Sequence, residues 1–384
     1  MSHRYVVLGA GMQGTAAAYD LGRFGDAGEV RLADMDEGRA VRAAARVNAL
    51  LNRPVVRPFG FNAKSDASVH GLLARMDACL SAVPYFLNLA LTERAIAAGV
   101  CFNDLGGNTD VVRGQLALDA KAKAASVSVI PDCGLPNTLA AQGIRSLDRA
   151  QHVRIYSGAL PQNRSLPLGY KVTFALDGLT NQYFGKALVL RNGKVQEVDT
   201  FTELESITFP APVGVLEAFT TSGGTSTCPY TYEGQIETYE YKTLRYPGHY
   251  DALKLLRDLG FLDQTAIDVD GVKVTPRAVF HKVMEKTWTF PDEPDLLILR
   301  VVVDGEKNGK PAGYIAELVD RPDPATGFSA MERMTAFTAA IVTAMQARKE
   351  IGPGAQPLEL AVDPGTVIAG LERRGLPLKI TRPA

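Results

Sequence analysis

Cysteine is scarce in this 384-residue chain, and its spacing excludes the sites that cysteine clusters build. The four cysteines are isolated, with no C-x-x-C pair and no histidine cluster beside them: Cys79, Cys101, Cys133 and Cys228. Such a pattern predicts neither a zinc site nor a disulfide framework. We therefore expect no metal, and we expect the cysteines to be reduced.

Excess charge of either sign and long apolar runs are missing as well. The 41 basic and 42 acidic residues give a net charge of −1 and form no blocks, so the chain has no basic footprint for nucleic acid or an anionic membrane. No run of 18 or more apolar residues occurs, and the N-terminal MSHRYVVLGAG leads into a predicted strand without a signal-peptide core. We expect a cytoplasmic protein with a small-molecule partner and with no nucleic-acid or membrane partner.

A glycine-rich turn follows the first predicted strand, residues 4–8 (RYVVL). The sequence G-A-G-M-Q-G then opens a helix-like stretch, which is the order of a Rossmann βαβ unit. The first glycine permits the tight turn, the second lets the backbone approach a pyrophosphate, and the third allows close packing of the helix on the strand. The residues predicted to bind a dinucleotide here are Gly9, Gly11, Met12, Gln13 and Gly14.

An acidic residue ends the second predicted strand, residues 29–33. Asp34 lies 20 residues beyond Gly14, where a carboxylate accepts hydrogen bonds from ribose hydroxyls and repels the extra phosphate of NADP. This favours NAD as the cofactor, although Arg31 and Arg39 leave a phosphate pocket open as the alternative.

Strands and helices continue to alternate up to about residue 130, which predicts a doubly wound parallel sheet. The predicted strands are 55–59, 78–82, 101–104 and 128–130, and the predicted helices are 66–74, 86–98 and 114–124. Because the carboxyl ends of such strands form the cofactor crevice, further residues are expected to line it. These are Ser81, Ala82, Val83, Pro84, Asp104 and Gly106.

Beyond about residue 150 strand-like runs occur without long helices between them, which predicts an α+β domain with a mostly antiparallel or mixed sheet. The runs are HVRIYSGAL, YKVTFAL, KALVLRNGKVQEV with an Asn-Gly turn, IETYEYKTLRY, and a hairpin of 296–303 with 311–319 around 304–309. Helices are expected at 250–259, 275–285 and 329–348, the last with a Ser329/Glu332 capping box.

This division predicts three segments in an α/β protein. They are a Rossmann NAD-binding domain over 1–130, an α+β substrate-binding domain over 131–325, and a C-terminal helical segment over 326–384 that returns to the Rossmann domain.

Several motifs together resemble the saccharopine dehydrogenase superfamily over nearly the whole chain. They are VVLGAGMQG, LSAVP followed by FLNLALTERAIAAGVCFNDLGGN, and TLRYPGH. Within the superfamily, EAFTTSGGTST, YKTLRYPGH and GALPQN look most like lysine 6-dehydrogenase. The chain departs from the family pattern D-x-G-x-x-P-G at residues 131–137, where the loop is abbreviated.

The resemblance implies NAD-dependent oxidation of the side-chain amine of L-lysine. The products would be 2-aminoadipate 6-semialdehyde, which cyclises to piperideine-6-carboxylate, together with ammonia and NADH. A homo-oligomer, dimeric or larger, is expected. Two alternatives stay open: a saccharopine or carboxynorspermidine-type dehydrogenase or reductase, and a non-catalytic NAD(H)-sensing protein.

Amine oxidation sets chemical demands on the site. The lysine ammonium, with an ordinary pKa of about 10.4, must lose a proton before the neighbouring carbon gives up hydride. The candidate catalytic residues are His249, Lys171 in the run YKVTF, and Asp132. Two of them have structural alternatives: His249 is then a helix N-terminal or solvated histidine, and Lys171 is an ordinary strand lysine that faces water.

The substrate's α-carboxylate needs a cation, and arginine suits it because its fork is bidentate. Arg245 in TLRYPGH is the candidate, with Tyr246 beside it, and a surface strand arginine is the alternative. Hydroxyls and glycines of the 217–227 tract suit a polar ligand, although a plain loop has the same composition. The candidates there are Glu217, Thr220, Thr221, Ser222 and Gly223.

Overall fold

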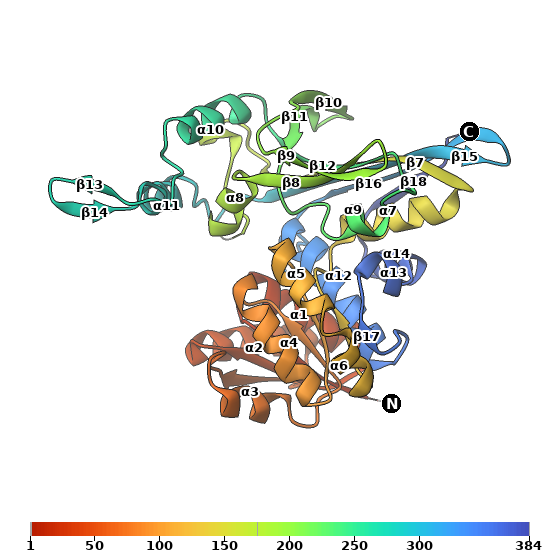
Figure 1. Cartoon of the computed structure of the whole chain (residues 1–384). Helices are drawn as coiled ribbons and strands as arrows, with labels where there is room; N and C mark the ends of the chain where they lie inside the picture. The colour runs from red at the N-terminus through yellow and green to blue at the C-terminus, as the bar shows by residue number, and fades with distance from the viewer. Residues whose placement is uncertain (1, 175, 384) are drawn as a thin grey trace.

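The computed structural model describes residues 2–174 and 176–383. A seven-stranded parallel sheet forms the centre of the first domain, which confirms the predicted fold class (Figure 1). Its strands are β1 (His3–Leu8), β2 (Ala27–Asp34), β3 (Val56–Gly60), β4 (Ala78–Ser81), β5 (Cys101–Asp104), β6 (Ser128–Ile130) and β17 (Gly354–Ala355). They are ordered β17-β6-β5-β4-β1-β2-β3, so the order in which strands are added to the sheet reverses between β1 and β4. In a sheet of this kind the ligand crevice lies at that reversal.

Helices cover both faces of this sheet. They are α1 (Met12–Phe24), α2 (Glu37–Leu51), α3 (Asp66–Leu73), η1 (Tyr85–Leu87), α4 (Asn88–Ala97), α5 (Thr109–Leu116), α6 (Asp119–Ala124) and α12 (Ala330–Ala347). Buried side chains of α1, α2 and α12 form one hydrophobic core, and those of α3 and α4 form another. Within the described residues, no helix combines the length and apolarity needed to cross a membrane.

The single helix predicted over 114–124 is wrong, because α5 and α6 are separate. The chain tightens between them, where the Leu118 amide donates to Gln115 O at 3.0 Å. The break starts a new helix at Asp119, whose carboxylate accepts from the Ala355 amide at 3.1 Å. The interruption thus ties α6 to β17.

A mixed sheet forms the second domain, also as predicted. Its strands are β7 (Arg149–Pro161), β8 (Lys186–Arg191), β9 (Lys194–Asp199), β10 (Glu205–Phe209), β11 (Gly214–Thr220), β12 (Thr238–Arg245), β15 (Asp295–Lys307), β16 (Lys310–Asp320) and β18 (Leu378–Thr381). The order is β10-β11-β12-β7-β15-β16-β18, with β8 between β12 and β9. The β12–β7 pair is parallel and the other described pairs of this sheet are antiparallel.

Both predicted hairpins are present, each closed by an Asn-Gly pair with positive φ. Asn192 and Gly193 join β8 to β9, and Asn308 and Gly309 join β15 to β16. The second loop is shorter than the predicted 304–309, because the ladder extends as far as Lys307 and Lys310.

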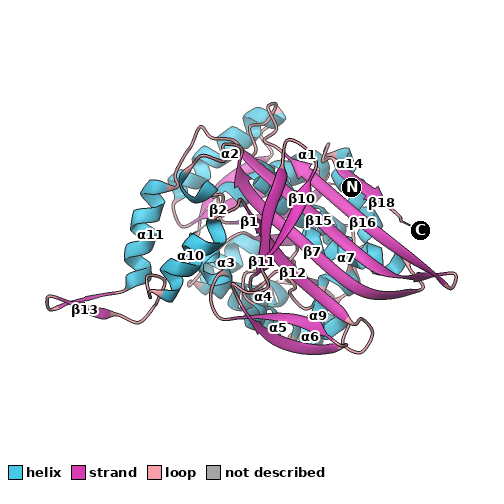
Figure 2. Ribbon diagram, turned by 90° about the horizontal axis from the view of Figure 1, so that it is seen from above, coloured by secondary structure: helices cyan, strands magenta, loops and turns pink. Residues whose placement is uncertain are grey.

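Short helices and a small hairpin complete this domain. They are α7 (Leu135–Ser146), η2 (Pro167–Gly169), α8 (Leu176–Gln182), α9 (Cys228–Thr231), α10 (His249–Asp258), β13 (Ile267–Val269), β14 (Val272–Val274) and α11 (Pro276–Thr287). Figure 1 shows the β13–β14 hairpin projecting beyond α11, and Figure 2 shows the same projection of β13 from above.

The strand-like run YKVTFAL contains no described strand. Residues 170–174 have no regular structure, residue 175 lies outside the described residues, and α8 begins at Leu176. Tyr170 is buried against Trp288 with ring centroids 5.0 Å apart, and the Val172 amide donates to Trp288 O at 3.0 Å.

The C-terminal residues 326–384, expected as one segment returning to the first domain, divide between the two sheets. Helix α12 begins with the predicted capping box of Ser329 and Glu332 and packs on α1, β4 and β5. After α13 (Leu358–Ala361) and α14 (Pro364–Arg373), β18 pairs with β16 of the second sheet.

A buried ion pair joins α14 to α1. The guanidinium of Arg374 donates to the Asp20 carboxylate at 2.7 Å, and their side chains are 4% and 1% exposed. Breaking such a pair by removing one partner leaves a buried charge without compensation. The contact therefore contributes to holding the C-terminal helices on the first domain.

We predict that Asp20→Ala lowers the free energy of unfolding by about 3 to 5 kcal/mol, because Arg374 stays buried without a partner. The matched control is Lys121→Ala, whose pair with Glu93 is solvent-exposed on both sides and should contribute less than about 1 kcal/mol. Urea unfolding of the two variants and the wild type is the measurement. Equal losses in both variants would contradict the role of the buried pair.

Candidate active site

Three glycines shape the turn between β1 and α1, each for a different reason. Gly9 has φ +93°, and a Cβ there would lie 2.7 Å from Ala82 O. A Cβ on Gly14 would lie 1.7 Å from Gly9 O, so the helix approaches the strand closely. Gly11, in contrast, faces open space within 4 Å. That space lies at the N-terminus of α1, where free N–H groups suit a pyrophosphate.

A cavity of about 700 Å³ opens beside this turn. It is lined by Gly9, Gly11, Asp34, Met35, Arg39, Phe61, Asn62, Ala63, Lys64, Ala82, Val83, Pro84, Phe86 and Leu87. The Asp34 carboxylate accepts from the Ala10 amide at 2.8 Å and from the Asp36 amide at 2.9 Å. A carboxylate has about four acceptor positions, so Asp34 keeps capacity for ribose hydroxyls. The donor set fits the adenosine half of a dinucleotide.

Two cations lie in the same cavity. Arg39 stands 3.7 Å from the Asp34 carboxylate, and Lys64 is a second lining residue. Met12 is half exposed at the start of α1, and Gln13 Oε1 is buried with no hydrogen-bond partner among the described residues. Neither Met12 nor Gln13 is among the residues that line the cavity.

The loops after β4 and β5 divide into lining and supporting residues. Ala82, Val83 and Pro84 line the cavity as predicted from their position. Ser81 is buried and donates to Asn88 Oδ1 at 2.7 Å, so it holds the start of α4. Asp104, also predicted to bind the cofactor, is fully buried and lies behind the loops instead of lining a cavity.

The buried carboxylate of Asp104 holds two loops together. It accepts from the Gly106 amide at 2.8 Å, from the Asp132 amide at 3.1 Å and from Gln115 Nε2 at 2.6 Å. Burial raises its pKa, and these three donors oppose the shift. Asp104 thereby fixes the backbone of Gly106 and Asp132 side by side.

Asp132 itself occupies a strained position at the carboxyl end of β6. Its φ is +56°, outside the range that non-glycine residues favour. Its carboxylate packs on Gly106, where an added Cβ would lie 1.9 Å from Asp132 Oδ1. Burial raises its pKa to about 7, a hydrogen bond from Ser226 opposes the shift, and the charges of Asp104 and Glu359 add to it. A carboxylate with a pKa near neutrality suits general base catalysis.

Two further cavities lie between the domains. One of about 440 Å³ is lined by Tyr85, Gly107 and Asn108 of the first domain and by residues of the second that include Asn181, Ser222, Gly223, Thr225 and Arg277. The other, of about 800 Å³, is lined on one side by Val83, Pro84 and Tyr85 and on the other by Asp177, Asn181, Arg277 and His281. The two share Tyr85, Asn181, Gln264 and Arg277, and the larger shares Ala82 to Pro84 and Phe86 with the cavity at the glycine turn. The three cavities therefore adjoin, as a site for a dinucleotide and a substrate requires.

The structure brings only two of the predicted substrate residues to these cavities, Ser222 and Gly223. Thr221 is buried and bonds Thr243 at 2.7 Å, and Thr220 is buried beside it. The carboxylate of Glu217 accepts from the Gly248 amide at 2.9 Å and from the Tyr250 amide, so it caps α10.

Arg245 lies in a closed aromatic cluster and lines none of the described cavities. It is 2% exposed, its Nε donates to the Tyr183 hydroxyl at 2.9 Å, and its guanidinium stands 5.1 Å from the Tyr170 ring. Neighbouring Tyr246 donates to Pro161 O at 2.9 Å. The motif TLRYPGH thus forms the interior of the second domain, because the aromatic residues around it close over the arginine.

His249 belongs to the same cluster. It is 1% exposed, its Nδ1 lies 3.0 Å from Leu168 O, and its Nε2 lies 3.0 Å from the Tyr183 hydroxyl. Burial, followed by the charge of Arg245, lowers its pKa to about 3. Lys171 donates to Glu293 O outside the described cavities and lies in no strand. Asp132 follows β6 and contacts Ser226 of the second domain, but like His249 and Lys171 it is not among the residues that line the described cavities.

Sequence reasoning missed Tyr85, Asn181, Gln264 and Arg277. Tyr85 directly follows the lining residue Pro84, and this position was a usable signal. The other three come from α8, the loop after α10, and α11, which are remote in sequence and carry no motif. Only the fold brings them together.

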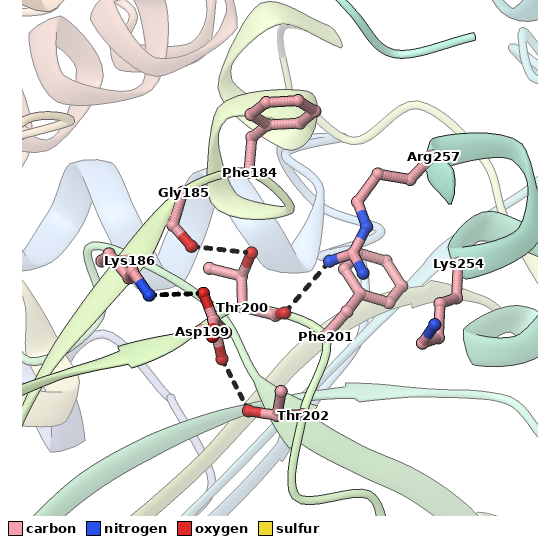
Figure 3. Close-up of a pocket in the computed structure, with 9 residues that line it drawn as sticks. All are labelled: Phe184, Gly185, Lys186, Asp199, Thr200, Phe201, Thr202, Lys254 and Arg257. Atoms are coloured by element: carbon pink, nitrogen blue, oxygen red, sulfur yellow. Dashed lines mark hydrogen bonds and ion pairs between the residues drawn. The ribbon is translucent and has the colours of Figure 1, made fainter. Parts of the chain in front are cut away.

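A fourth cavity, of about 530 Å³, lies wholly within the second domain (Figure 3). It contains Lys186, Lys254 and Arg257, but Lys186 pairs with Asp199 and the other two pair with Asp258. With its cations paired, this cavity has no unpaired charge to offer a ligand. Across the part of the chain that the structure describes, no group of His, Cys, Asp and Glu could hold a metal ion.

The fold and the glycine turn define a dinucleotide-binding protein of the α/β class with a second domain over the crevice. Residues 5–130 match the family model of the saccharopine dehydrogenase NADP binding domain, and residues 130–376 match that of the saccharopine dehydrogenase C-terminal domain. The chain belongs to the saccharopine dehydrogenase family, which confirms the resemblance.

Curated relatives cover part of this chain. A saccharopine dehydrogenase [NADP(+), L-glutamate-forming] of Schizosaccharomyces pombe is 27% identical over 244 residues, 59% of this chain and 53% of its own length. The enzyme of the same name from Pyricularia oryzae is 25% identical over 237 residues, 58% of this chain and 51% of its own. The chain spans about half the length of these relatives.

Solved structures share the whole fold. The apo saccharopine dehydrogenase (L-Glu forming) of Saccharomyces cerevisiae superposes with a TM-score of 0.78 at 18% identity, covering 100% of both chains. The homospermidine synthase of Legionella pneumophila in complex with NAD gives a TM-score of 0.65 at 12% identity, covering 99% of this chain and 92% of that one. At these identities the likeness extends to the fold alone.

The glycine turn generates a paired prediction. Gly14→Ala should lower the melting temperature because its methyl group meets Gly9 O, whereas Gly11→Ala has free space and a φ of −74° that alanine tolerates. Gly11→Ala should therefore melt like the wild type and yet bind NADH roughly tenfold or more weakly, because its methyl group occupies the pyrophosphate position. Melting curves and fluorescence titration with NADH separate the two effects. Unchanged NADH affinity in Gly11→Ala would contradict binding of the pyrophosphate at this turn.

Proposed function

We propose that this protein is an NAD-dependent dehydrogenase that oxidises the side-chain amine of L-lysine to 2-aminoadipate 6-semialdehyde. The observation that carries the proposal is the position of Asp132. It follows β6, a strand of the same sheet as the glycine turn, contacts Ser226 of the second domain, and has a pKa that burial raises to about 7. Family membership supports the reaction class, oxidation of an amine that belongs to an amino acid.

The reaction consumes lysine, NAD⁺ and water and yields the semialdehyde, ammonia, NADH and a proton. The semialdehyde then cyclises to piperideine-6-carboxylate. A bound nicotinamide supplies the hydride acceptor. Asp132 accepts the proton from the lysine ammonium, so that the nitrogen lone pair can expel hydride from the adjacent carbon. Asp104 keeps Asp132 in place through its backbone amide.

The saccharopine dehydrogenase reaction is the second candidate. The observations that favour it are the names of the curated relatives and the combined size of the adjoining interdomain cavities, about 440 and 800 Å³, which leaves room for a secondary amine larger than lysine. The same cavities would also have room for the substrate of a carboxynorspermidine-type reaction. A protein that senses NAD(H) without chemistry would bind cofactor and turn over none of these amines.

The discriminating experiment is a turnover panel at alkaline pH with NAD or NADP against lysine, saccharopine and ornithine. We expect NADH formation with lysine and none with cofactor alone. Faster turnover of saccharopine than of lysine would replace the first candidate by the second. Tight NADH binding without turnover of any amine would assign the protein to the sensors.

Asp34 generates a prediction about the choice of cofactor. Its carboxylate, buried at the end of β2, should repel the 2′-phosphate of NADP, while Arg39 and Lys64 stand near enough to bind that phosphate once the acid is gone. We expect the wild type to prefer NAD, although the curated relatives are named for NADP(+). Asp34→Ser should shift kcat/KM towards NADP, and a wild type that uses both equally would contradict this role.

Asp132 generates a prediction about pH. A carboxylate base works only when deprotonated, so kcat/KM for the wild type should fall below about pH 7, the pKa of Asp132. In Asp132→Asn this fall in kcat/KM at low pH should be absent, and kcat should be roughly 10²- to 10⁴-fold lower. The rise of kcat/KM at alkaline pH, caused by deprotonation of the lysine ammonium with its pKa of about 10.4, should remain in the wild type and in the variant.

Stability provides the control for the same variant. A carboxyl whose pKa is raised on folding binds its proton more tightly in the folded state, so its stabilising effect is lost as pH rises through about 7. Asp132→Asn, which stays neutral, should gain melting temperature relative to wild type at pH 8 and lose that advantage at pH 4. A kcat loss accompanied by a lower melting temperature at pH 8 would indicate misfolding instead of a missing base.

Two expectations from the sequence stay predictions. Whether the protein is a homo-oligomer, dimeric or larger, can be tested by light scattering of the purified protein. A cytoplasmic location is open to fractionation of the source cells.

A further inference from the structure

One buried arginine between the domains has an unpaired nitrogen. Arg277 lies near the start of α11 and is 6% exposed. Its Nε donates to Leu262 O at 2.6 Å, and its Nη1 donates to Asn181 Oδ1 at 3.3 Å. The guanidinium carbon stands 4.7 Å from the centre of the Phe184 ring. The third nitrogen, Nη2, is buried and has no hydrogen-bond partner among the residues that the structure describes.

The charge of this arginine also lacks a partner. Within residues 2–174 and 176–383, no carboxylate forms an ion pair with Arg277. Burial lowers its pKa, and the more distant charges of Asp177 and Asp263 only oppose that shift. An arginine keeps its proton under such conditions. The protein therefore holds a positive charge at this place without a compensating acid.

Comparison with other buried arginines makes the state of Arg277 distinctive. Arg333 is 7% exposed but bonds the Asp320 carboxylate at 2.9 Å. Arg245 also lacks an acid, but it is enclosed by Tyr170 and Tyr183 and lines none of the described cavities. Arg277 alone among these three lines a cavity, and it lines both interdomain cavities.

Leaving a buried charge and a buried donor unmatched is energetically costly, which is why such groups are normally paired. The cost is recovered when a ligand brings an anion to the free edge of the guanidinium. A carboxylate suits it best, because its two oxygens match neighbouring guanidinium nitrogens. Stacking on Phe184 and the bond to Asn181 fix the fork in advance, so little conformational entropy is lost on binding.

We propose that Arg277 binds the carboxylate of the substrate and makes the site selective for amino acids over simple amines. This rests on the proposed function, since it orients the amine of the same molecule towards Asp132. The role that the sequence suggested for Arg245 then belongs to Arg277. Recognition of the carboxylate is supplied by α11 and the preceding loop, and the proton acceptor comes from the end of β6.

The test compares two ligands that differ in charge at one end, norleucine and norleucinamide. Norleucine has the lysine skeleton without the side-chain amine, so the enzyme has no amine to oxidise there. Binding is measured by calorimetry with NADH present, for wild type, Arg277→Gln, Arg277→Lys and Lys282→Ala. Lys282 lies on the same helix with an exposed side chain, which makes it the matched control.

We expect the wild type and Lys282→Ala to bind norleucine roughly 30-fold or more tightly than its amide. Arg277→Gln should bring that ratio close to one, with NADH affinity unchanged, and Arg277→Lys should restore part of it. Because the ratio is measured within each protein, a loss of folded material does not imitate the effect.

A ratio in Arg277→Gln equal to that of the wild type would overturn the proposal, and so would failure of the wild type to bind both norleucine and a second carboxylate probe, glutarate. These results are independent of turnover. A protein that shows the expected ratio but does not oxidise lysine keeps its carboxylate site and loses only the proposed reaction.

Discussion

The arrangement of the candidate active site depends on the buried carboxylate of Asp104, which accepts three hydrogen bonds. It ties the loop after β5 to the loop after β6 and to α5 through Gln115. Because the two loops follow neighbouring parallel strands, the carboxylate of Asp104 holds them side by side. The positive φ of Asp132 and its close approach to Gly106 both occur at this junction, where the surrounding hydrogen bonds support an otherwise unfavourable backbone.

Polar contacts within the second domain, and from it to α13, connect the 217–227 tract to the helix that follows β6. Asn137 of α7 donates to Gly224 O at 3.2 Å and accepts from the Tyr239 hydroxyl at 2.9 Å. The hydroxyl of Thr227 donates to the buried carboxylate of Glu359 at 2.9 Å. These contacts place the 217–227 tract against the end of β6, so that residues of two separate sheets face a common space.

Local patterns sufficed to predict the first half of the site from the sequence. The glycine turn and Asp34 depend on a strand, a turn and a helix that are contiguous, so residue spacing alone determines their geometry. The fate of Arg245 and His249 could not be predicted in this way, because whether a side chain faces a cavity or an aromatic cluster depends on Tyr170 and Tyr183, which lie more than 60 residues away. Arg277 shows the converse. Its partner Asn181 lies 96 residues away, and nothing in the local run TPRAVF distinguishes it from a surface arginine.

The division of the C-terminal residues between the two sheets has a consequence for biosynthesis. Helix α12 covers β4 and β5 beside α1, and β17 forms one edge of the parallel sheet; both follow β7 to β16 of the second sheet in the chain. During translation the ribosome delivers β1 to β6 well before the helix that completes their hydrophobic cover. One apolar face of the first domain therefore stays partly uncovered until α12 has been synthesised, and exposed apolar surface of this kind favours association with other chains.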